Sequence, residues 1–386
     1  MAAMARGRFP RAWPLAAAAV LAAAVLIAAE SYLAEEPGPE RSSLTPTRRA
    51  DLVEQVLLGH RMWVPRGHRL EVFADGLTRP RLMAVAPDGT LHVTEPHPGR
   101  VLALPDRDGD GRADARVVVR AGLEFPHGLA FHDGALYIAE GTRVTRFRDG
   151  AAQILVSGIP TGGHVTRTIA IRDGKLYLSA GSSCNVCEER DRRRAAVVRY
   201  NLDGSGEEIL AEGLRNTVGI VFGPDGKLWG TDNGRDMLGD DEPPEEVNII
   251  ERGRHYGWPY CYGDRIGDRD FSHRNRAFCA ATQPPAVAIQ AHSAPLGLRW
   301  GPDGALYVAL HGSWNRSIPT GYKVIRIVRR DAGYEVLDHV TGWLEGEGRA
   351  DAKAWGRPVD VIFDRAGTLY ISDDFAGIIY RLLRAR

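Results

Sequence analysis

The chain has 386 residues, which is long for one domain but compatible with a single large all-β domain. Lysine plus arginine equals aspartate plus glutamate at 49 each, so the formal net charge is zero, which excludes the basic excess typical of nucleic-acid-binding proteins. Glycine is abundant at 44 residues, which predicts many turns and few long helices. Helical periodicity is confined to about residues 48–58.

The N-terminal 29 residues differ from the rest of the chain. Three arginines precede an almost uninterrupted apolar run over residues 13–29. A positive start followed by such a run predicts a signal peptide, and a length of about 17 residues also reaches the lower limit for a membrane anchor. A buried core helix is the disfavoured alternative, because the run is terminal and has no polar face. Residues 30–47, rich in Pro, Glu and Ser, predict a linker.

We therefore expect an exported protein, periplasmic or extracellular, with membrane contact only through its N-terminal segment. A folded domain is expected over residues 48–386. Within it, a short phrase recurs six times: a turn that ends in glycine, followed by alternating apolar residues. An apolar run precedes most copies, so each copy predicts a β-hairpin. The six turn glycines are Gly89, Gly134, Gly174, Gly226, Gly304 and Gly367.

The spacing of these glycines indicates the architecture. Successive separations are 45, 40, 52, 78 and 63 residues. Periods of about 40 to 50 residues with strand-rich units are typical of β-propellers. We therefore predict an all-β fold, a six-bladed β-propeller, with inserted loops in the two longest intervals. A β-sandwich with incidental Asp-Gly turns is the alternative.

The segment "DRDGDGRAD" resembles a calcium-binding loop. Its aspartates fall at positions 1, 3, 5 and 9 of an EF-hand-like pattern, and Gly111 at position 6 allows a sharp turn. The acid expected at position 12 is replaced by Val117, and strand-like runs flank the loop instead of helices. We predict a structural calcium hairpin, with a plain polar turn as the alternative. The predicted ligands are Asp106, Asp108, Asp110 and Asp114.

A polar side chain precedes the inner strand of five of the six predicted hairpins. Because the blades of a propeller are radial, these side chains are expected to converge at one mouth of the central channel. Histidines and arginines in a ring suit an anionic, hydrogen-bonding ligand, and histidine accepts a proton near neutral pH. For each histidine alone, a buried structural role is the alternative. The five residues are His127, His164, Arg215, His292 and Arg357.

The four cysteines form two local pairs. Cys184 and Cys187 make a C-x-x-C motif, and Cys261 lies 18 residues before Cys279. In an oxidising compartment we predict the disulfides Cys184–Cys187 and Cys261–Cys279. A zinc site made of all four is the alternative, although a second C-x-x-C is missing. A c-type haem site is excluded, because Glu188 and not histidine follows Cys187.

Several motifs together resemble the glucose/sorbosone dehydrogenase family, soluble six-bladed propellers that use pyrroloquinoline quinone (PQQ). The motifs are "GGHVTR", "GSSCNVCEE", "GLRNTVG", "LWGTDNGRDMLGDD", "YGWPYCY" and "HGSWNRSIPTGYKVIRI", which span about residues 162–327. The last motif and the C-x-x-C are most similar to the sorbosone-dehydrogenase-like branch. The resemblance implies a quinoprotein that oxidises a sugar, alcohol or aldehyde, with calcium as a second cofactor and a quinone or cytochrome as electron acceptor.

The resemblance also implies a role for each matched residue. His164 corresponds to the general base, and Arg215 to the arginine beside the reactive carbonyl, where negative charge develops. Gly234 and Arg235 correspond to residues whose backbone carbonyls bind the cofactor's calcium. The remaining predicted cofactor contacts are Asn216, Asn233, Arg357, His127, His311 and Ser313.

The sequence departs from the family pattern beside the general base. Gly163 stands where soluble glucose dehydrogenases have an acid, and Ser182 and Ser183 occupy a loop where those enzymes have an aspartate. The partner that orients His164 is therefore not identified, and Asp232 is a first guess. The cofactor-contacting lysine has no equivalent, since His311 and Ser313 lie at its place. Glucose is accordingly not the expected substrate.

Two other functions are compatible with the sequence. A lactonase-type propeller hydrolase would hold calcium in the channel with carboxylates and asparagines, whereas the ring here consists of histidines and arginines. A non-catalytic binding propeller is the second alternative. The acidic segment over residues 236–246 has two interpretations as well, a solvated face or a loop that supports calcium.

Overall fold

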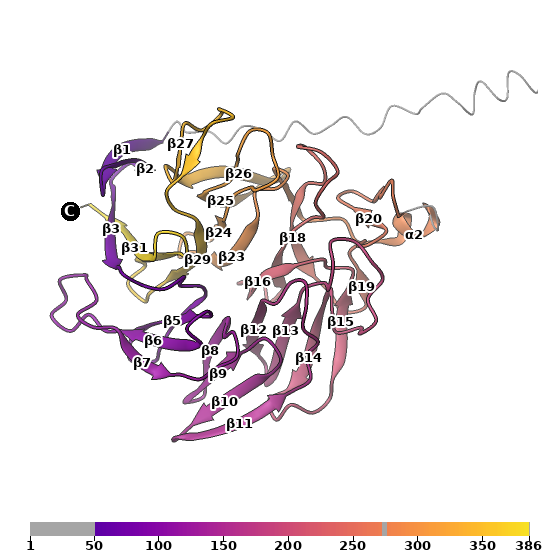
Figure 1. The fold of residues 1–386 in the computed structure, drawn as a ribbon, viewed down its shortest axis with the longest axis horizontal. Coiled ribbons are helices and arrows are strands. Elements are labelled where there is room, and N and C mark those ends of the chain that lie inside the picture. The colour runs from indigo at the N-terminus through magenta and orange to yellow at the C-terminus, as the bar shows by residue number, and fades with distance from the viewer. Residues whose placement is uncertain (1–50, 272–275, 386) are drawn as a thin grey trace, which may run out of the picture. The chain divides into compact units, whose positions relative to one another are not determined.

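The computed structural model describes residues 51–271 and 276–385, so the predicted signal or anchor segment and the linker lie outside the described residues. Six antiparallel sheets are arranged as blades around a central channel (Figure 1). Five sheets have four strands, and one has a fifth strand added in parallel. The six-bladed β-propeller predicted from the glycine spacing is therefore confirmed, and the β-sandwich is wrong. In the described part of the chain, no helix has the length and apolarity needed to cross a membrane.

Each blade runs from an inner strand at the channel to an outer strand at the rim. In this order, the first blade consists of β4 (Met83–Val85), β5 (Leu91–Glu95), β6 (Arg100–Leu104) and β7 (Val117–Arg120). The second consists of β8 (Gly128–His132), β9 (Ala135–Ala139), β10 (Val144–Arg148) and β11 (Ala151–Val156). The third consists of β12 (Arg167–Arg172), β13 (Lys175–Ala180), β14 (Ala196–Asn201), β15 (Glu208–Glu212) and β19 (Arg254–His255). The fourth consists of β16 (Thr217–Phe222), β17 (Leu228–Asp232), β18 (Glu245–Ile250) and β22 (Val287–Ile289). The fifth consists of β23 (Pro295–Trp300), β24 (Leu306–Leu310), β25 (Lys323–Arg330) and β26 (Gly333–Val340). The sixth consists of β29 (Pro358–Phe363), β30 (Leu369–Asp373), β31 (Ile378–Arg384) and β3 (His68–Ala74).

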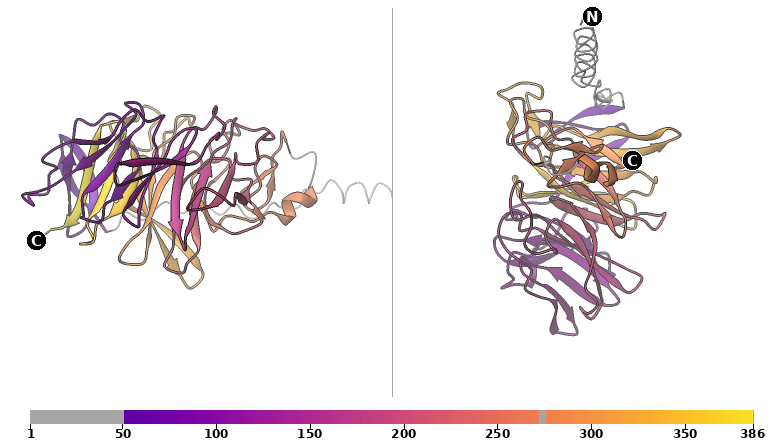
Figure 2. Two further views of the ribbon diagram at one scale, coloured as in Figure 1. Left: turned by 90° about the horizontal axis from the view of Figure 1, so that it is seen from below. Right: turned by 90° about the vertical axis from the view of Figure 1, so that its right-hand side faces the viewer.

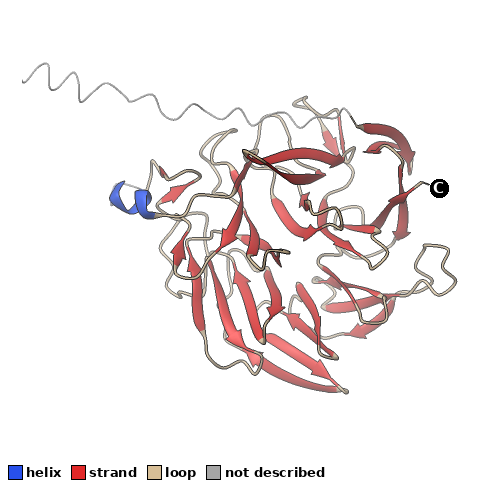
Figure 3. Ribbon diagram, turned by 180° about the vertical axis from the view of Figure 1, so that it is seen from behind, coloured by secondary structure: helices blue, strands red, loops and turns tan. Residues whose placement is uncertain are grey.

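The repeated glycine turn joins the inner strand of each blade to the second strand. The φ angles of the six glycines range from 67° to 94°, which lies in the left-handed region where other residues are strained. At Gly89 and Gly134 a side chain would have free space, so the conformation alone favours glycine there. Strands dominate the resulting architecture (Figure 3), and within the described residues α2 (Arg276–Ala281) is the only helix.

The last blade joins the two ends of the propeller. Its outer strand β3 comes from the start of the described chain and pairs with β31 from the end, in a register that sets His68 opposite Arg384. Before β3, strands β1 (Leu52–Leu57) and β2 (His60–Pro65) form an antiparallel hairpin. The helical periodicity near residues 48–58 therefore indicated the wrong conformation, because residues 52–57 form a strand that pairs with β2.

The two long intervals between repeats contain insertions, as predicted. Residues 251–286, between β18 and β22, hold β19, the short hairpin of β20 (Cys261–Tyr262) and β21 (Ile266–Gly267), and α2. This insertion lies on the outer side of the blades (Figure 2). The second insertion holds the hairpin of β27 (Leu344–Glu345) and β28 (Lys353–Ala354).

The six inner strands enclose the central channel. Each contacts the inner strand of the next blade, from β4 through β8, β12, β16 and β23 to β29 and back to β4. The part of the channel that is lined by the middle and the C-terminal ends of these strands has a volume of about 340 Å³. Since all inner strands run the same way, the loops that precede them lie at one mouth of this channel.

Candidate active site

The predicted functional residues lie at one mouth of the channel. Every inner strand begins there, and the second strand of each blade, which is antiparallel to it, ends there. Residues just before a first strand and just after a second strand are thereby brought to the same mouth. This holds for His127, His164, Arg215, Asn216, Asn233, Gly234, Arg235, His311, Ser313 and Arg357.

His164 is held by Ser182. Its Nδ1 lies 3.0 Å from the Ser182 hydroxyl oxygen and 3.2 Å from the Ser182 carbonyl oxygen. The hydroxyl donates its hydrogen to the carbonyl of Cys184 at 2.7 Å, so it accepts at the imidazole. Nδ1 therefore carries the hydrogen, and Nε2 has a free lone pair with no hydrogen bond to any described residue. This arrangement makes Nε2 the proton acceptor.

The surroundings of His164 keep its ring neutral. Burial and the nearby positive charge of Arg215 lower the pKa of His164 to about 4, against the opposing effect of the Ser182 carbonyl. A neutral imidazole at physiological pH can accept a proton from a substrate hydroxyl. The guess that Asp232 orients His164 is wrong. The carboxylate of Asp232 instead accepts hydrogen bonds from the backbone amides of Arg215 and Asn216 at 3.0 and 2.8 Å.

The guanidinium of Arg215 is buried and fully hydrogen-bonded. Its side chain is 5% exposed. Nε and one terminal nitrogen donate to the backbone and side-chain oxygens of Asn185 at 3.0 and 2.9 Å. The remaining N–H groups reach the carbonyls of Asn233 and Gly234 and the carboxylate of Asp236, at 3.2, 2.7 and 3.0 Å. All five N–H groups are used, so Arg215 acts on a ligand through its charge and not by donating a further hydrogen bond.

Asn216 lies beside His164 and has an unused acceptor. Its side-chain oxygen Oδ1 is buried and has no hydrogen-bond partner in the described chain. A Cβ atom at Gly181 would come within 2.5 Å of this oxygen and 2.7 Å of the His164 Cβ, so only glycine fits between them. A buried acceptor without a partner is rare in folded proteins, and it indicates a missing ligand group.

The side-chain amide of Asn233 already has hydrogen-bond partners within the propeller. Its side-chain amide donates to the carbonyls of Asn216 and Pro295 at 3.2 and 2.8 Å, which links the fourth and fifth blades. The predicted contact between Asn233 and the cofactor stays a prediction.

A second cluster at the same mouth joins several blades. Asp374 accepts hydrogen bonds from His311 Nε2 at 2.8 Å and from Arg81 at 2.7 Å. Burial opposes the ionisation of Asp374, but the hydrogen bond from His311 and the charge of Arg81 outweigh it and hold the pKa of this carboxyl well below its usual value. Burial lowers the pKa of His311 to about 4, so its ring is neutral and donates to the carboxylate.

Two further predicted residues support this cluster. His127 has no exposed surface, and its Nε2 lies 3.5 Å from a terminal nitrogen of Arg81. Arg357 donates to the carbonyls of His311 and Gly312 at 3.0 and 2.7 Å, and its guanidinium lies 5.5 Å from the ring centre of Tyr322. The other terminal nitrogen of Arg357, Nη1, makes no hydrogen bond in the described chain and can therefore bind an anionic group.

Sequence reasoning missed Arg81 and Asp374, although both follow the rules that found the other residues. Arg81 lies two positions before β4, as Arg215 does before β16. Asp374 directly follows β30, as Asn233 follows β17. Applying the same register to the first and sixth copies would have found them.

Three residues that were predicted to contact the cofactor or its calcium already interact with other groups of the protein. The Ser313 hydroxyl accepts a hydrogen bond from the backbone of Thr320 at 3.0 Å, inside its own loop. The carbonyl of Gly234 already accepts from Arg215, and a cation at that distance repels calcium. The side chain of Arg235 pairs with the Asp268 carboxylate at 2.9 Å. Calcium binding by the Gly234 and Arg235 carbonyls and cofactor binding by Ser313 stay predictions.

The acidic segment over residues 236–246 is neither a simple solvated face nor a group of free carboxylates. Asp240 accepts hydrogen bonds from Ser317, and Asp241 pairs with Arg316 at 3.3 Å. The side chains of Glu245 and Glu246 are buried, and burial raises the pKa of each to about 7. The segment is thus integrated into the fold through cations and backbone amides.

The aspartate loop after β6 brings three of its four predicted ligands together. One carboxylate oxygen each from Asp106, Asp108 and Asp114 lies within 4.8 Å of the others. Asp110 is outside this group and accepts from the backbone amide of Arg112 at 2.7 Å. Gly111 has a φ of 85°, as the sharp turn requires. The structural calcium stays a prediction.

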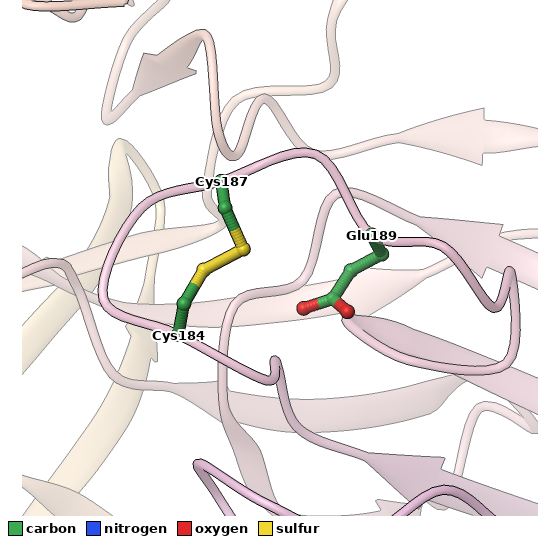
Figure 4. Close-up of side chains that lie close together, drawn as sticks. All are labelled: Cys184, Cys187 and Glu189. Carbon is green, nitrogen blue, oxygen red and sulfur yellow. A yellow bond between two sulfur atoms is a disulfide. The ribbon is translucent and has the colours of Figure 1, made fainter.

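The cysteines form the two predicted disulfides. Cys184 pairs with Cys187, and Cys261 pairs with Cys279. The zinc alternative is wrong, because the disulfides use all four sulfurs. The Cys184–Cys187 bond closes the loop that follows β13, close to the site (Figure 4).

The fold and its mouth define a six-bladed propeller with a histidine and arginine site at one end of the channel. The chain belongs to the TrAA12-like family, whose model matches residues 62–385.

The chain is also similar to characterised members of this group. It is 26% identical over 400 residues to the pyrroloquinoline quinone-dependent pyranose dehydrogenase of Coprinopsis cinerea, covering 84% of this chain and 55% of that protein. It is 25% identical to the pyrroloquinoline quinone-dependent sugar dehydrogenase of Hypocrea jecorina, covering 82% and 88% of the two chains. The holo structure of the Coprinopsis PQQ domain superimposes with a TM-score of 0.73 at 26% identity, covering 84% of this chain and 97% of that domain. The resemblance to PQQ-dependent sugar dehydrogenases is confirmed.

Proposed function

We propose that this protein is an exported quinoprotein dehydrogenase that oxidises a sugar or a related alcohol or aldehyde, with His164 as the general base. The observation that carries the proposal is the pairing of His164 with Ser182, which leaves Nε2 free, while the unpartnered oxygen of Asn216 lies close to the same residue. The PQQ-dependent relatives supply the cofactor class. The two disulfides support export.

The residues at the mouth fit PQQ in charge and in hydrogen bonding. The cofactor carries carboxylates, and Arg357 offers a free N–H group for one of them. The buried oxygen of Asn216 needs a donor, and a bound ligand can provide it. When bound, PQQ supplies the hydride acceptor. Calcium fits the Gly234 carbonyl less well, because this carbonyl already accepts a hydrogen bond from Arg215.

The chain's own groups then have distinct tasks. Nε2 of His164 takes the proton from the substrate hydroxyl, and the hydrogen bond from Nδ1 to Ser182 keeps the ring in that orientation. Arg215 provides a fixed positive charge that is not screened by water and stabilises negative charge in the transition state. The same charge keeps His164 unprotonated before the reaction. Electrons then pass to an acceptor, a quinone or a cytochrome.

The alternatives have weaker support at this mouth. A lactonase-type hydrolase needs carboxylates free to bind calcium, whereas Asp374 and Asp232 are both engaged in hydrogen bonds. A non-catalytic propeller needs no fixed tautomer at His164. A dehydrogenase accounts both for the fixed tautomer of His164 and for carboxylates that are engaged in hydrogen bonds within the protein.

Titration of the calcium-loaded protein with PQQ tests the proposal. We expect one-to-one binding in calorimetry, because the site offers a cationic group and an unpaired acceptor for a single planar anion. A parallel titration after chelation of calcium shows whether the metal contributes. Absence of heat and of spectral change in both titrations would contradict the proposal.

The pH dependence of kcat/KM provides a second test. Only neutral His164 can accept a proton, and its pKa is lowered to about 4. The acid limb of the profile is therefore expected near pH 4, with activity rising from about pH 3 to about pH 5 and constant above. Circular dichroism at each pH separates this limb from unfolding. A limb at about pH 6.5 or above, the range of an unperturbed histidine, would show that His164 is not in the described environment.

A further inference from the structure

The loop that follows β13 contacts both candidate catalytic side chains. It covers residues 181–187, and the Cys184–Cys187 disulfide closes its second half, residues 184–187 (Figure 4). The loop has no strand or helix of its own. Two of its polar residues, Ser182 and Asn185, contact His164 and Arg215 respectively.

Ser182 is the contact to His164. Its side chain is fully buried. Its carbonyl accepts from the backbone amide of His164 at 2.9 Å, and its hydroxyl accepts from the imidazole. Its own amide donates to the carbonyl of Arg215 at 2.7 Å. The hydroxyl donates its hydrogen to the carbonyl of Cys184, which is one end of the disulfide, and its remaining lone pairs therefore face the imidazole.

Asn185 is the contact to Arg215. Its carbonyl oxygen and its side-chain oxygen accept from two different nitrogens of the guanidinium, at 3.0 and 2.9 Å. The side-chain oxygen also accepts from the backbone amide of Asp236 at 2.8 Å, and the carbonyl accepts from Trp258 at 3.1 Å. Asn185 thus fixes the plane of the guanidinium from one side, while Asp236 contacts it from the other.

Arg194 fastens the loop to the segment that carries His164. Its side chain is 3% exposed. One terminal nitrogen donates to the carbonyls of Ser182, Gly162 and His164, at 2.6, 2.8 and 3.2 Å, and the other donates to Pro160 at 2.7 Å. The loop and the His164 segment therefore move together.

We propose that the loop of residues 181–187 positions the site, with Ser182 fixing the ring of His164, Asn185 fixing the guanidinium of Arg215, and the Cys184–Cys187 disulfide keeping the two contacts in register. Ser182 and Asn185 act through their partners and are positioning residues. The kinetic consequence rests on the proposed function, whereas the positioning itself does not.

Nitrogen-15 NMR of the cofactor-free protein, labelled at histidine, tests the positioning directly. We expect His164 to be the Nδ1–H tautomer in the wild type. Ser182→Ala removes the closer acceptor, the hydroxyl, and leaves only the Ser182 carbonyl, 3.2 Å from Nδ1. The population of the Nδ1–H form is therefore expected to fall, which gives a mixture of tautomers in place of the single form. Ser183→Ala is the matched control, because the neighbouring hydroxyl contacts Glu189 at 2.8 Å and the Cys187 sulfur at 3.7 Å but neither His164 nor Arg215. An unchanged His164 spectrum in Ser182→Ala would overturn the proposal.

The disulfide is tested with the same spectrum. The double variant Cys184→Ser, Cys187→Ser is expected to produce the tautomer mixture. The double variant Cys261→Ser, Cys279→Ser removes the disulfide of the insertion and is expected to leave His164 unchanged. Equal effects of both double variants on His164 would show only a general loss of stability and would overturn the role of the first disulfide.

Kinetics of the PQQ-loaded enzyme give the second readout. Ser182→Ala and Asn185→Ala are each expected to lower kcat by about 10- to 100-fold with KM nearly unchanged, because a displacement of about 1 Å can cost about 100-fold. Ser182→Thr keeps the hydroxyl and is expected to recover most of the loss. A fall confined to KM would overturn the positioning role. Failure of PQQ to bind the wild type would instead contradict the proposed function, and the NMR result would still decide the positioning.

Discussion

His164→Ala lowers kcat by about 10²- to 10⁴-fold, the usual contribution of a general base, while PQQ still binds. The loss is expected because Nε2 is the free nitrogen of a neutral ring, whereas binding depends on groups that the substitution leaves in place. Stopped-flow reduction of the bound cofactor measures the chemical step, and calorimetry measures the binding. Added imidazole is expected to restore part of the rate, because the substitution leaves a cavity at the base.

His132→Ala serves as the control for this experiment. His132 ends β8, at the opposite end of the channel, and is partly exposed. Its replacement is expected to leave kcat and cofactor binding unchanged. A wild-type rate in His164→Ala would rule out His164 as the base, and loss of PQQ binding in that variant would assign it a binding role instead.

Arg215→Met is expected to have the largest effect on stability. The substitution removes five hydrogen bonds and leaves Asp236 without its buried cation. Breaking a buried ion pair by removing one partner costs about 3–5 kcal/mol. The free energy of unfolding from denaturant titration is expected to fall by about that amount, and kcat is expected to fall as well, because the fixed charge beside His164 is lost.

Arg192→Met is the matched control. Arg192 also pairs with a carboxylate, Glu212 at 3.1 Å, but its side chain is 73% exposed. The unfolding midpoint of this variant is expected to match the wild type within experimental scatter. If Arg215→Met were as stable as Arg192→Met, the buried network around Arg215 would contribute nothing.

The fold could be predicted because its signal is repeated. Six copies of one turn, each with a glycine in the left-handed region, indicate the number of blades and the position of every inner hairpin. The hairpin of β1 and β2 is not a copy of the repeat, so the repeat does not reveal it. Its first strand is short, and a short segment can look helical when it is considered alone.

The site was predicted in part. Residues next to strand ends follow from the repeat register, and the resemblance implied their roles. The orienting partner of His164 could not be found this way, because it depends on which side chain a loop without regular structure brings to Nδ1. Ser182 and Asn185 belong to such a loop, and the hydrogen bonds that reveal them join residues 18 and 30 positions apart.

Pairing between β3 and β31 has a consequence for how the protein is made. The two strands join residues about 310 positions apart, such as Glu71 and Arg381, so the ring cannot close until nearly the whole chain has been synthesised. Until then β3 and β30 belong to a partial ring with exposed strand edges, which readily pair with other chains. A chain that ended before β31 would keep those open edges permanently, and we expect aggregation to be its first defect.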